Sequence, residues 1–369
     1  MMYLCFSIIM GGCLLALIPA DKKPSIKLPQ KWLSISTAFI PVFAAAPVIY
    51  LAADINKYRD ESFWISLLHI LFTAETGRAW TALLFLCLCF LGLIGIMSRT
   101  ASFPIVYAAG IFLIFGMITT QGVTGHAVSM GSYPGAAAHI FHFMAVSAWL
   151  GVLFVVSWYS TDDNYWKEFT GWFTPIAVGC VTVVIFSGML MASFLTEDLT
   201  NSWLLTYGQT LLLKHLLFIP LLTYACINGF LLRRKINSHK NYSPRIWWRA
   251  ESLIAVVIFV VTAFMSEQEP PHNIQQTLAS QEPTPIFQSL LSFEVSPETN
   301  VTFSPDVVSI LFLVSGLLYI MIIVIGFQKK LSAPITLLLS LLTVLSLYFG
   351  VMNSLEDTSA SMSYLFQED

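Results

Sequence analysis

The chain has 369 residues, of which 56% are hydrophobic and only 11% are charged. Soluble domains carry about 25% charged residues, so this composition excludes a soluble enzyme and a disordered protein. Lys and Arg total 18 against 21 Asp and Glu, a net charge of −3. No basic run is long enough to follow a phosphate backbone, so nucleic acid is not expected as a partner. The composition predicts a helical bundle in contact with membrane lipid.

Ten apolar runs, almost free of charge, follow one another along the chain. An α-helix needs about 20 apolar residues to cross about 30 Å of hydrocarbon, so each run predicts one transmembrane helix. The fold class is therefore all-α, a polytopic membrane bundle of about ten helices. The predicted spans cover residues 1–20, 32–53, 79–98, 101–121, 135–159, 171–194, 208–232, 250–266, 307–327 and 332–352.

The first run is expected to remain as a membrane span and not to be a secretory signal. No Lys or Arg precedes it and four Lys follow it, whereas a signal peptide carries its positive charge in front. With the N-terminus outside, 14 of the 18 Lys and Arg fall in inner segments and 3 in outer ones, while Lys214 lies within a span. This bias follows the positive-inside rule. It predicts both termini outside a cytoplasmic (cell) membrane, in a multi-pass topology.

The long segment 267–306 is predicted to face the outside. It carries acidic residues, Pro and Gln but no Lys or Arg. Within it, Ile286–Phe293 is expected to lie as a short amphipathic piece on the membrane surface.

Histidines are concentrated near the outer ends of the predicted helices. His139 and His142 are three residues apart and therefore neighbours on one helical face. His126 stands where the preceding span ends, joined to them by a short loop with Gly and Pro. His215 lies about 10 Å into its own span, a depth that matches His142. Because ionisable residues inside spans are usually functional, these four histidines are predicted to hold a metal ion or haem.

Methionines at similar depth add sulfur ligands to this prediction. Met130, Met144 and Met189 are the candidates, and Met189 and Met191 point about 200° apart, so one of them at most is expected to face the same interior. Imidazole and thioether together suit copper, and thioether favours Cu(I). The six cysteines all fall inside spans and are expected to be packing residues.

Three charged residues in or near the spans leave alternatives open. Lys214 either extends its ammonium group toward the membrane surface or pairs within the bundle, where it would hold an anionic group. Arg249 and Glu251 flank the inner end of the eighth span and are either interfacial or part of the site.

Several short motifs resemble the copper resistance protein D (CopD) family. They are Ser187-Gly188, Tyr207-Gly208 followed by Leu211–Lys214, Asn228, Arg249-Ala250-Glu251 and Pro270-Pro271; Gly125-His126-Ala127 and His142 followed by Trp149-Leu150-Gly151 resemble the preceding helices. The resemblance covers roughly 100–272. It divides the chain into N-terminal helices (1–100), CopD-like copper-site helices (101–266), an extracytoplasmic loop (267–306) and a C-terminal helix hairpin with an outside tail (307–369).

The resemblance implies movement of copper across the cytoplasmic membrane, usually as uptake, with an extracytoplasmic copper-binding protein as partner. Because segment 267–306 is too short for a copper-binding β-sandwich, that partner would be a separate protein. No phosphate-binding loop is present, so the expected protein is a permease and not an enzyme. Two alternatives remain: a haem-binding electron-transfer protein with axial histidines, and an assembly factor that delivers copper to a membrane oxidase.

Overall fold

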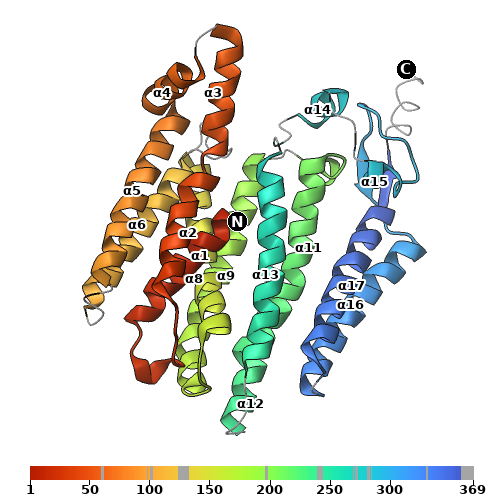
Figure 1. Cartoon of the computed structure of the whole chain (residues 1–369). Helices are drawn as coiled ribbons and strands as arrows, with labels where there is room; N and C mark the ends of the chain where they lie inside the picture. Colours follow the sequence, from red (N-terminus) through yellow and green to blue (C-terminus); the bar gives the residue numbers. More distant parts are fainter. Residues whose placement is uncertain are drawn as a thin grey trace, which may run out of the picture. The chain divides into compact units, whose positions relative to one another are not determined.

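The computed structural model describes residues 1–59, 62–97, 99, 103–123, 133–195, 198–238, 244–268, 270, 273–280, 283, 285–329 and 331–358. These residues are almost entirely α-helical (Figure 1), which confirms the all-α fold. Within them, nine helices are long and apolar enough to cross a membrane, and they correspond to the second to tenth predicted spans. They are Gln30–Lys57, Glu75–Met97, Pro104–Gly122, Tyr133–Tyr159, Trp166–Phe194, Thr206–Ile236, Arg245–Ser266, Val307–Gln328 and Ala333–Asn353.

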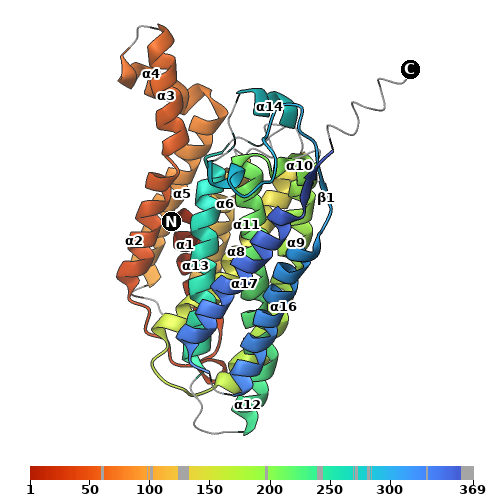
Figure 2. The same cartoon turned by 90° about the vertical axis from the view of Figure 1, so that its right-hand side faces the viewer.

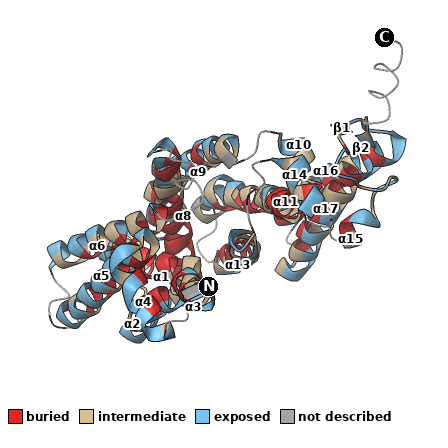
Figure 3. Cartoon of the chain, turned by 90° about the horizontal axis from the view of Figure 1, so that it is seen from above, coloured by how far each residue is buried: buried red, intermediate tan, exposed pale blue. Residues whose placement is uncertain are grey.

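The first predicted span forms a shorter helix, α1 (Met2–Leu17), of 16 residues. At 1.5 Å per residue it is about 24 Å long, less than the about 30 Å of a hydrocarbon core. It packs against α2 (Gln30–Phe43), α6 (Pro104–Gly122) and α8 (Tyr133–Tyr159). Neighbouring helices therefore surround α1, and Figure 3 shows the buried residues concentrated along α1 and α8.

The chain divides into two compact units. Unit 1 comprises Met1–Phe194 and Arg233–Ser252, and unit 2 comprises Leu195–Leu232 and Leu253–Asp369. Both units draw on segment 101–266. The division of the chain at residues 100, 266 and 306 remains a prediction from the sequence.

Unit 1 is built from α1, α2, α6, α8 and five further elements, together with the start of α13 (Arg245–Ser266). The further elements are α3 (Ala46–Arg59), α4 (Phe63–Thr73), α5 (Glu75–Met97), α9 (Trp166–Leu195) and α12 (Leu232–Ser238). α5 packs against α2, α4 and α6. α1 and α8 meet at two glycines: a Cβ added at Gly11 would lie 2.1 Å from the carbonyl oxygen of Gly151. Only glycine permits this approach of two helix backbones.

Several basic segments meet at one end of unit 1. The charge bias predicted that these segments lie on the inner side of the membrane. Lys27 N donates to Tyr159 O at 2.9 Å, and the Trp172 indole donates to Lys22 O at 2.9 Å. Arg245 pairs with Asp163 through two hydrogen bonds of 3.0 and 2.9 Å. Beside this pair, the side chain of Ser25 and the backbone N–H groups of Ser25 and Asn164 donate to Asp162 and lower the pKa of its carboxyl group.

Unit 2 contains α10 (Leu199–Ser202), α11 (Thr206–Cys226), the hairpin of α16 (Val307–Gln328) and α17 (Ala333–Asn353), and most of α13. α16 and α17 lie side by side (Figure 2). α11 continues through a π-helical turn, η2 (Ile227–Leu231), into α12. Strands β1 (Val301–Phe303) and β2 (Leu355–Asp357) pair antiparallel, with Val301 opposite Asp357.

Segment 267–306 folds onto unit 2. It forms α14 (Ile274–Ser280), α15 (Pro285–Gln288) and β1, and its Leu278 and Phe287 are buried in one apolar cluster with Leu204, Met352 and others. Phe287 is 1% exposed. Protein side chains therefore cover Phe287, and the expectation that Ile286–Phe293 lies on the membrane surface stays a prediction.

Candidate functional site

His142 is held in one tautomer by its neighbour on α9. Its Nδ1 lies 3.0 Å from Ser187 Oγ, while the Ser187 hydroxyl donates to the carbonyl oxygen of Val183. A hydroxyl has a single proton to donate, so Ser187 Oγ accepts from the Nδ1–H of His142. This tautomer leaves the lone pair on Nε2. The contact with α9 therefore fixes both the tautomer and the ring orientation of His142.

Gly188 also contacts the imidazole ring of His142. A Cβ added at Gly188 would lie 3.5 Å from His142 Cε1 and 3.7 Å from Nδ1, which is ordinary van der Waals contact. The ring thus lies directly over the backbone of α9. Ser187 and Gly188 together bring α9 close to His142, and both belong to the motif that resembles the CopD family.

His139 lies on α8 three residues before His142 and is half-buried. Its ring stacks on Phe143 with centroids 6.4 Å apart. Phe143 in turn makes edge contacts with Tyr3 and Phe6 of α1, at 5.1 and 4.9 Å. One histidine of the pair is therefore supported through an aromatic stack on α1, and the other through a hydrogen bond to α9.

The other predicted ligands have different settings. His126 and Met130 lie outside the described residues. Met144 is half-buried and packs against the core of unit 1, and Met189 is 67% exposed. Two residues from Ser187, Met189 points about 200° away from it around the helix, whereas Met191, four residues from Ser187, shares its face. In the described part of the chain, no three His, Cys, Asp or Glu side chains come together as a metal-binding group.

His215 and Lys214 lie on α11, in unit 2. His215 Nδ1 lies 2.7 Å from the carbonyl oxygen of Leu211 on the same helix. The carbonyl accepts, so Nδ1 carries the proton and Nε2 the lone pair, as for His142. Lys214 is half-buried, and no carboxylate among the described residues lies within ion-pair distance of its ammonium group.

Glu251 lies at the other end of unit 1 and is 2% exposed. Its neighbours in the sequence contact α8: Arg249 Nε donates to Ser157 O at 2.9 Å, and the Arg249 guanidinium lies 5.1 Å from the Trp158 ring centre. The Trp158 indole donates to Ser252 Oγ at 3.0 Å. Sequence reasoning found Arg249 and Glu251 but missed Ser157, Trp158 and Ser252. An aromatic residue at a span end beside an arginine was the available signal.

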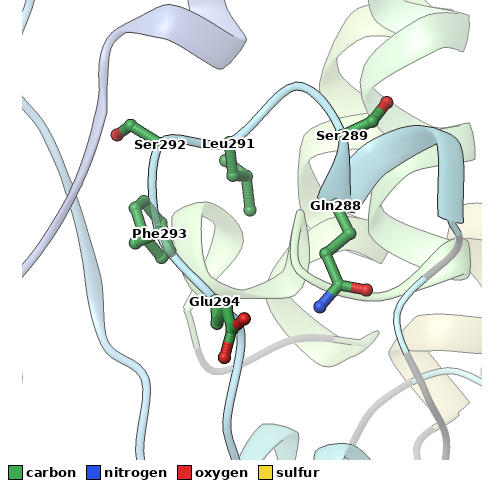
Figure 4. A pocket seen from close by; sticks show the side chains of 6 residues that line it. All are labelled: Gln288, Ser289, Leu291, Ser292, Phe293 and Glu294. Atoms are coloured by element: carbon green, nitrogen blue, oxygen red, sulfur yellow. The ribbon is translucent and has the colours of Figure 1, made fainter.

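A shallow hollow in unit 2 offers little metal chemistry. It is lined by Gln288, Ser289, Leu291, Ser292, Phe293 and Glu294, which follow one another in a single loop (Figure 4). Glu294 is the one ionisable side chain among these lining residues. The ligand chemistry of the described residues therefore centres on α8 and α9 of unit 1.

These features define a multi-pass membrane protein in which the imidazole side chains of α8 are supported by neighbouring helices. Residues 167–265 match the sequence profile of the family named Copper resistance protein D. This segment of the chain is thus similar to the CopD family, and the resemblance described above is confirmed for it. Ser187, Gly188, Lys214 and Glu251 all fall within the matched segment.

One relative carries a functional name. The chain is 27% identical over 190 residues to the "Copper transport protein CutJ" of Bacillus subtilis (strain 168). The match covers 49% of this chain and 35% of the relative, so about a third of the relative's length is spanned. No solved structure matches the chain significantly.

Proposed function

We propose that this protein transports copper ions inward across the cytoplasmic membrane. The observation that carries the proposal is the hydrogen bond between His142 Nδ1 and Ser187 Oγ, which fixes the ring between α8 and α9 and puts the lone pair on Nε2. A metal-binding histidine typically has its second nitrogen fixed in this way. The CopD match around Ser187 and the copper transport relative indicate which metal this ligand serves.

The ligand set favours Cu(I) as the transported species. His139 and His142 supply imidazole, and His126 and Met130 would join them from the connecting segment. Of the other predicted sulfur ligands, Met144 lies five residues, about 7.5 Å along the axis, beyond His139 on α8. Met191 replaces Met189 as the better placed thioether on α9. Imidazole with thioether suits copper, and thioether selects Cu(I). His215 provides a further ligand in unit 2.

Lys214 and Glu251 have supporting roles in this proposal. The half-buried Lys214 orders the interior of unit 2, and the buried Glu251 belongs to the polar network at the inner end of unit 1. We propose a carrier and not an enzyme, in contact with membrane lipid and supplied by a separate extracytoplasmic copper-binding protein.

Transport by purified protein in liposomes tests the proposal. Liposomes contain a Cu(I)-selective fluorescent chelator, and Cu(I) is added outside under anaerobic conditions. His142→Ala should lower the initial rate by about tenfold or more, because removing even a supporting residue of a metal ligand costs 10–100-fold in affinity. His69→Ala is the matched control, since His69 lies on α4 and its exposed side chain hydrogen-bonds Thr73 on the same helix.

The competing functions give different results in the same preparation. Equal rates for wild type and His142→Ala would refute the proposed route. A Soret band that disappears with His142→Ala would identify haem electron transfer instead. Bound copper without any transport would identify a copper-delivery factor.

A further inference from the structure

Sulfur atoms from different helices meet inside the core of unit 1. Cys87 on α5 lies with its Sγ 4.0 Å from the Sδ of Met117 on α6. Cys87 is 1% exposed and Met117 is fully buried. Cys89, two residues further along α5, is exposed. One cysteine of this pair therefore faces a methionine across a helix interface, and the other does not.

A second pair of sulfur side chains converges beside Gly110 on α6. A Cβ added at Gly110 would lie 3.1 Å from Cys13 Sγ of α1 and 3.1 Å from Met97 Cε of α5. Both side chains are almost fully buried, at 1% and 2% exposure. The missing side chain of Gly110 is what lets a thiol and a thioether reach the same place.

The two pairs lie along one line of the core. Cys87 and Met97 are ten residues apart on α5, and Met117 and Gly110 are seven apart on the antiparallel α6, so the pairs are separated by about 10–15 Å. Met10 precedes Cys13 by one helical turn and is 1% exposed in the same cluster. Five sulfur atoms are thus distributed between α1, α5 and α6.

We propose that Cys87 and Met117 bind one Cu(I) ion within unit 1, and that Cys13 and Met97 form the next sulfur pair on the same route. This inference rests on copper as the transported ion. Two Cu–S bonds of about 2.3 Å at an angle of about 120° place their sulfur atoms about 4 Å apart. The observed 4.0 Å between Cys87 Sγ and Met117 Sδ meets this requirement without rearrangement.

The chemistry keeps the apolar core uncharged. When Cu(I) binds, the S–H bond of Cys87 breaks, a Cu–S bond forms and the proton leaves to water. Copper remains Cu(I), so no oxidant or reductant is needed. One positive ion replaces one proton, and the cost of burying a net charge is avoided.

The sulfur core begins next to the histidine pair. His139 stacks on Phe143, Phe143 contacts Phe6 of α1, and Phe6 shares its cluster with Met10 and Cys13. Positions 6, 10 and 13 lie on one face of α1. An ion released from His139 would therefore meet the sulfur atoms of Met10 and Cys13 along α1.

Anaerobic Cu(I) titration of the full chain in detergent, against a competing Cu(I) chelator, tests this site, with X-ray absorption to identify the copper neighbours. The double variant Cys87→Ser/Met117→Leu should lose about one bound Cu(I) per chain and the matching sulfur scattering. Cys89→Ser is the matched control and should retain both. The same titration in a His142→Ala background removes the contribution of His142.

The result can overturn the site independently of transport. Copper with only nitrogen or oxygen neighbours in wild type, or unchanged copper and sulfur scattering in the double variant, would show that these sulfur atoms only pack. If the double variant aggregates, Met117→Leu alone decides, because it removes one sulfur neighbour at nearly constant volume. Sulfur-bound Cu(I) without liposome transport would instead refute the proposed function and leave the site standing.

Discussion

A single hydroxyl proton determines which nitrogen His142 can offer. Ser187 donates that proton to the carbonyl oxygen of Val183, so the hydroxyl can only accept from the imidazole. At His215 a backbone carbonyl, with no proton at all, has the same effect. Two histidines on different helices thus present Nε2 for the same elementary reason.

Replacing Ser187 should weaken copper binding without removing a ligand. Ser187→Ala leaves Nδ1 of His142 without its acceptor on α9, so the ring loses its fixed tautomer and orientation. We expect a 10–100-fold loss of Cu(I) affinity, measured by chelator competition. Ser193→Ala is the control, because the Ser193 hydroxyl is exposed on the same helix and donates to Leu190 O. Equal losses in both variants would contradict a specific role for Ser187.

The sequence alone identified the histidines as candidate ligands, but not the neighbouring side chains that hold them in place. His142 was predictable because an imidazole inside an apolar span demands a function. Ser187 was visible only as part of a motif, since its role depends on its Oγ on α9 lying 3.0 Å from Nδ1 of His142 on α8. Periodicity showed that Met189 and Met191 face apart. Which of them shares the face of Ser187 became clear only when that contact was known.

At the scale of whole helices, α1 and α8 pack closely because glycines leave no side chain between their backbones. Gly11 and Gly151 bring the two backbones into contact, and a Cβ at Gly151 would lie 2.3 Å from the carbonyl oxygen of Ser7. Tyr3 and Phe6 contact Phe143 at one end of the same interface. The aromatic support of His139 therefore depends on this glycine contact.

Filling the contact should destabilise unit 1. Gly151→Ala forces two helix backbones apart, and overpacking of this kind costs about 1–3 kcal/mol. We expect a lower melting temperature in detergent, and Gly151→Leu should prevent recovery of folded protein. Gly92→Ala on α5 is the control, because nothing lies within 4 Å of a Cβ there. A melting temperature for Gly151→Ala equal to that of Gly92→Ala would show that α1 and α8 do not need this approach.

The helices could be predicted from apolar runs. The positions where a helix breaks, and the segments that pack over the helix ends, could not. The run at 32–53 gave no sign that α2 ends at Phe43 and α3 begins at Ala46. The hydropathy of the sequence gives no sign of the π-helical turn at Ile227–Leu231 either. Segment 267–306 has the composition of a loop, yet its few apolar residues, such as Phe287, are enough to anchor it. Such features depend on tertiary packing, which periodicity does not describe.

For the molecule as a whole, charge should set the direction in which the helices cross the membrane. α1 runs parallel to α8, because Tyr3 and Phe6 contact Phe143 while Gly11 contacts Gly151. The basic segment after α1 consequently meets the segment after α8, where Lys27 bonds Tyr159. Segments that the charge bias assigns to the inner side thus lie together at one end of unit 1.

Cysteine labelling tests which side of the membrane that end faces. In a cysteine-free background, Glu298→Cys and Lys167→Cys each introduce a thiol at an exposed position. Because positively charged segments are retained inside, a membrane-impermeant maleimide should label Glu298→Cys in intact cells. Lys167→Cys should react only after the membrane is permeabilised, and that second step confirms that its thiol is accessible. Labelling of Lys167→Cys in intact cells, with Glu298→Cys protected, would invert the topology. The histidines of α8 would then lie toward the cytoplasm, and the direction of copper movement would have to be reversed.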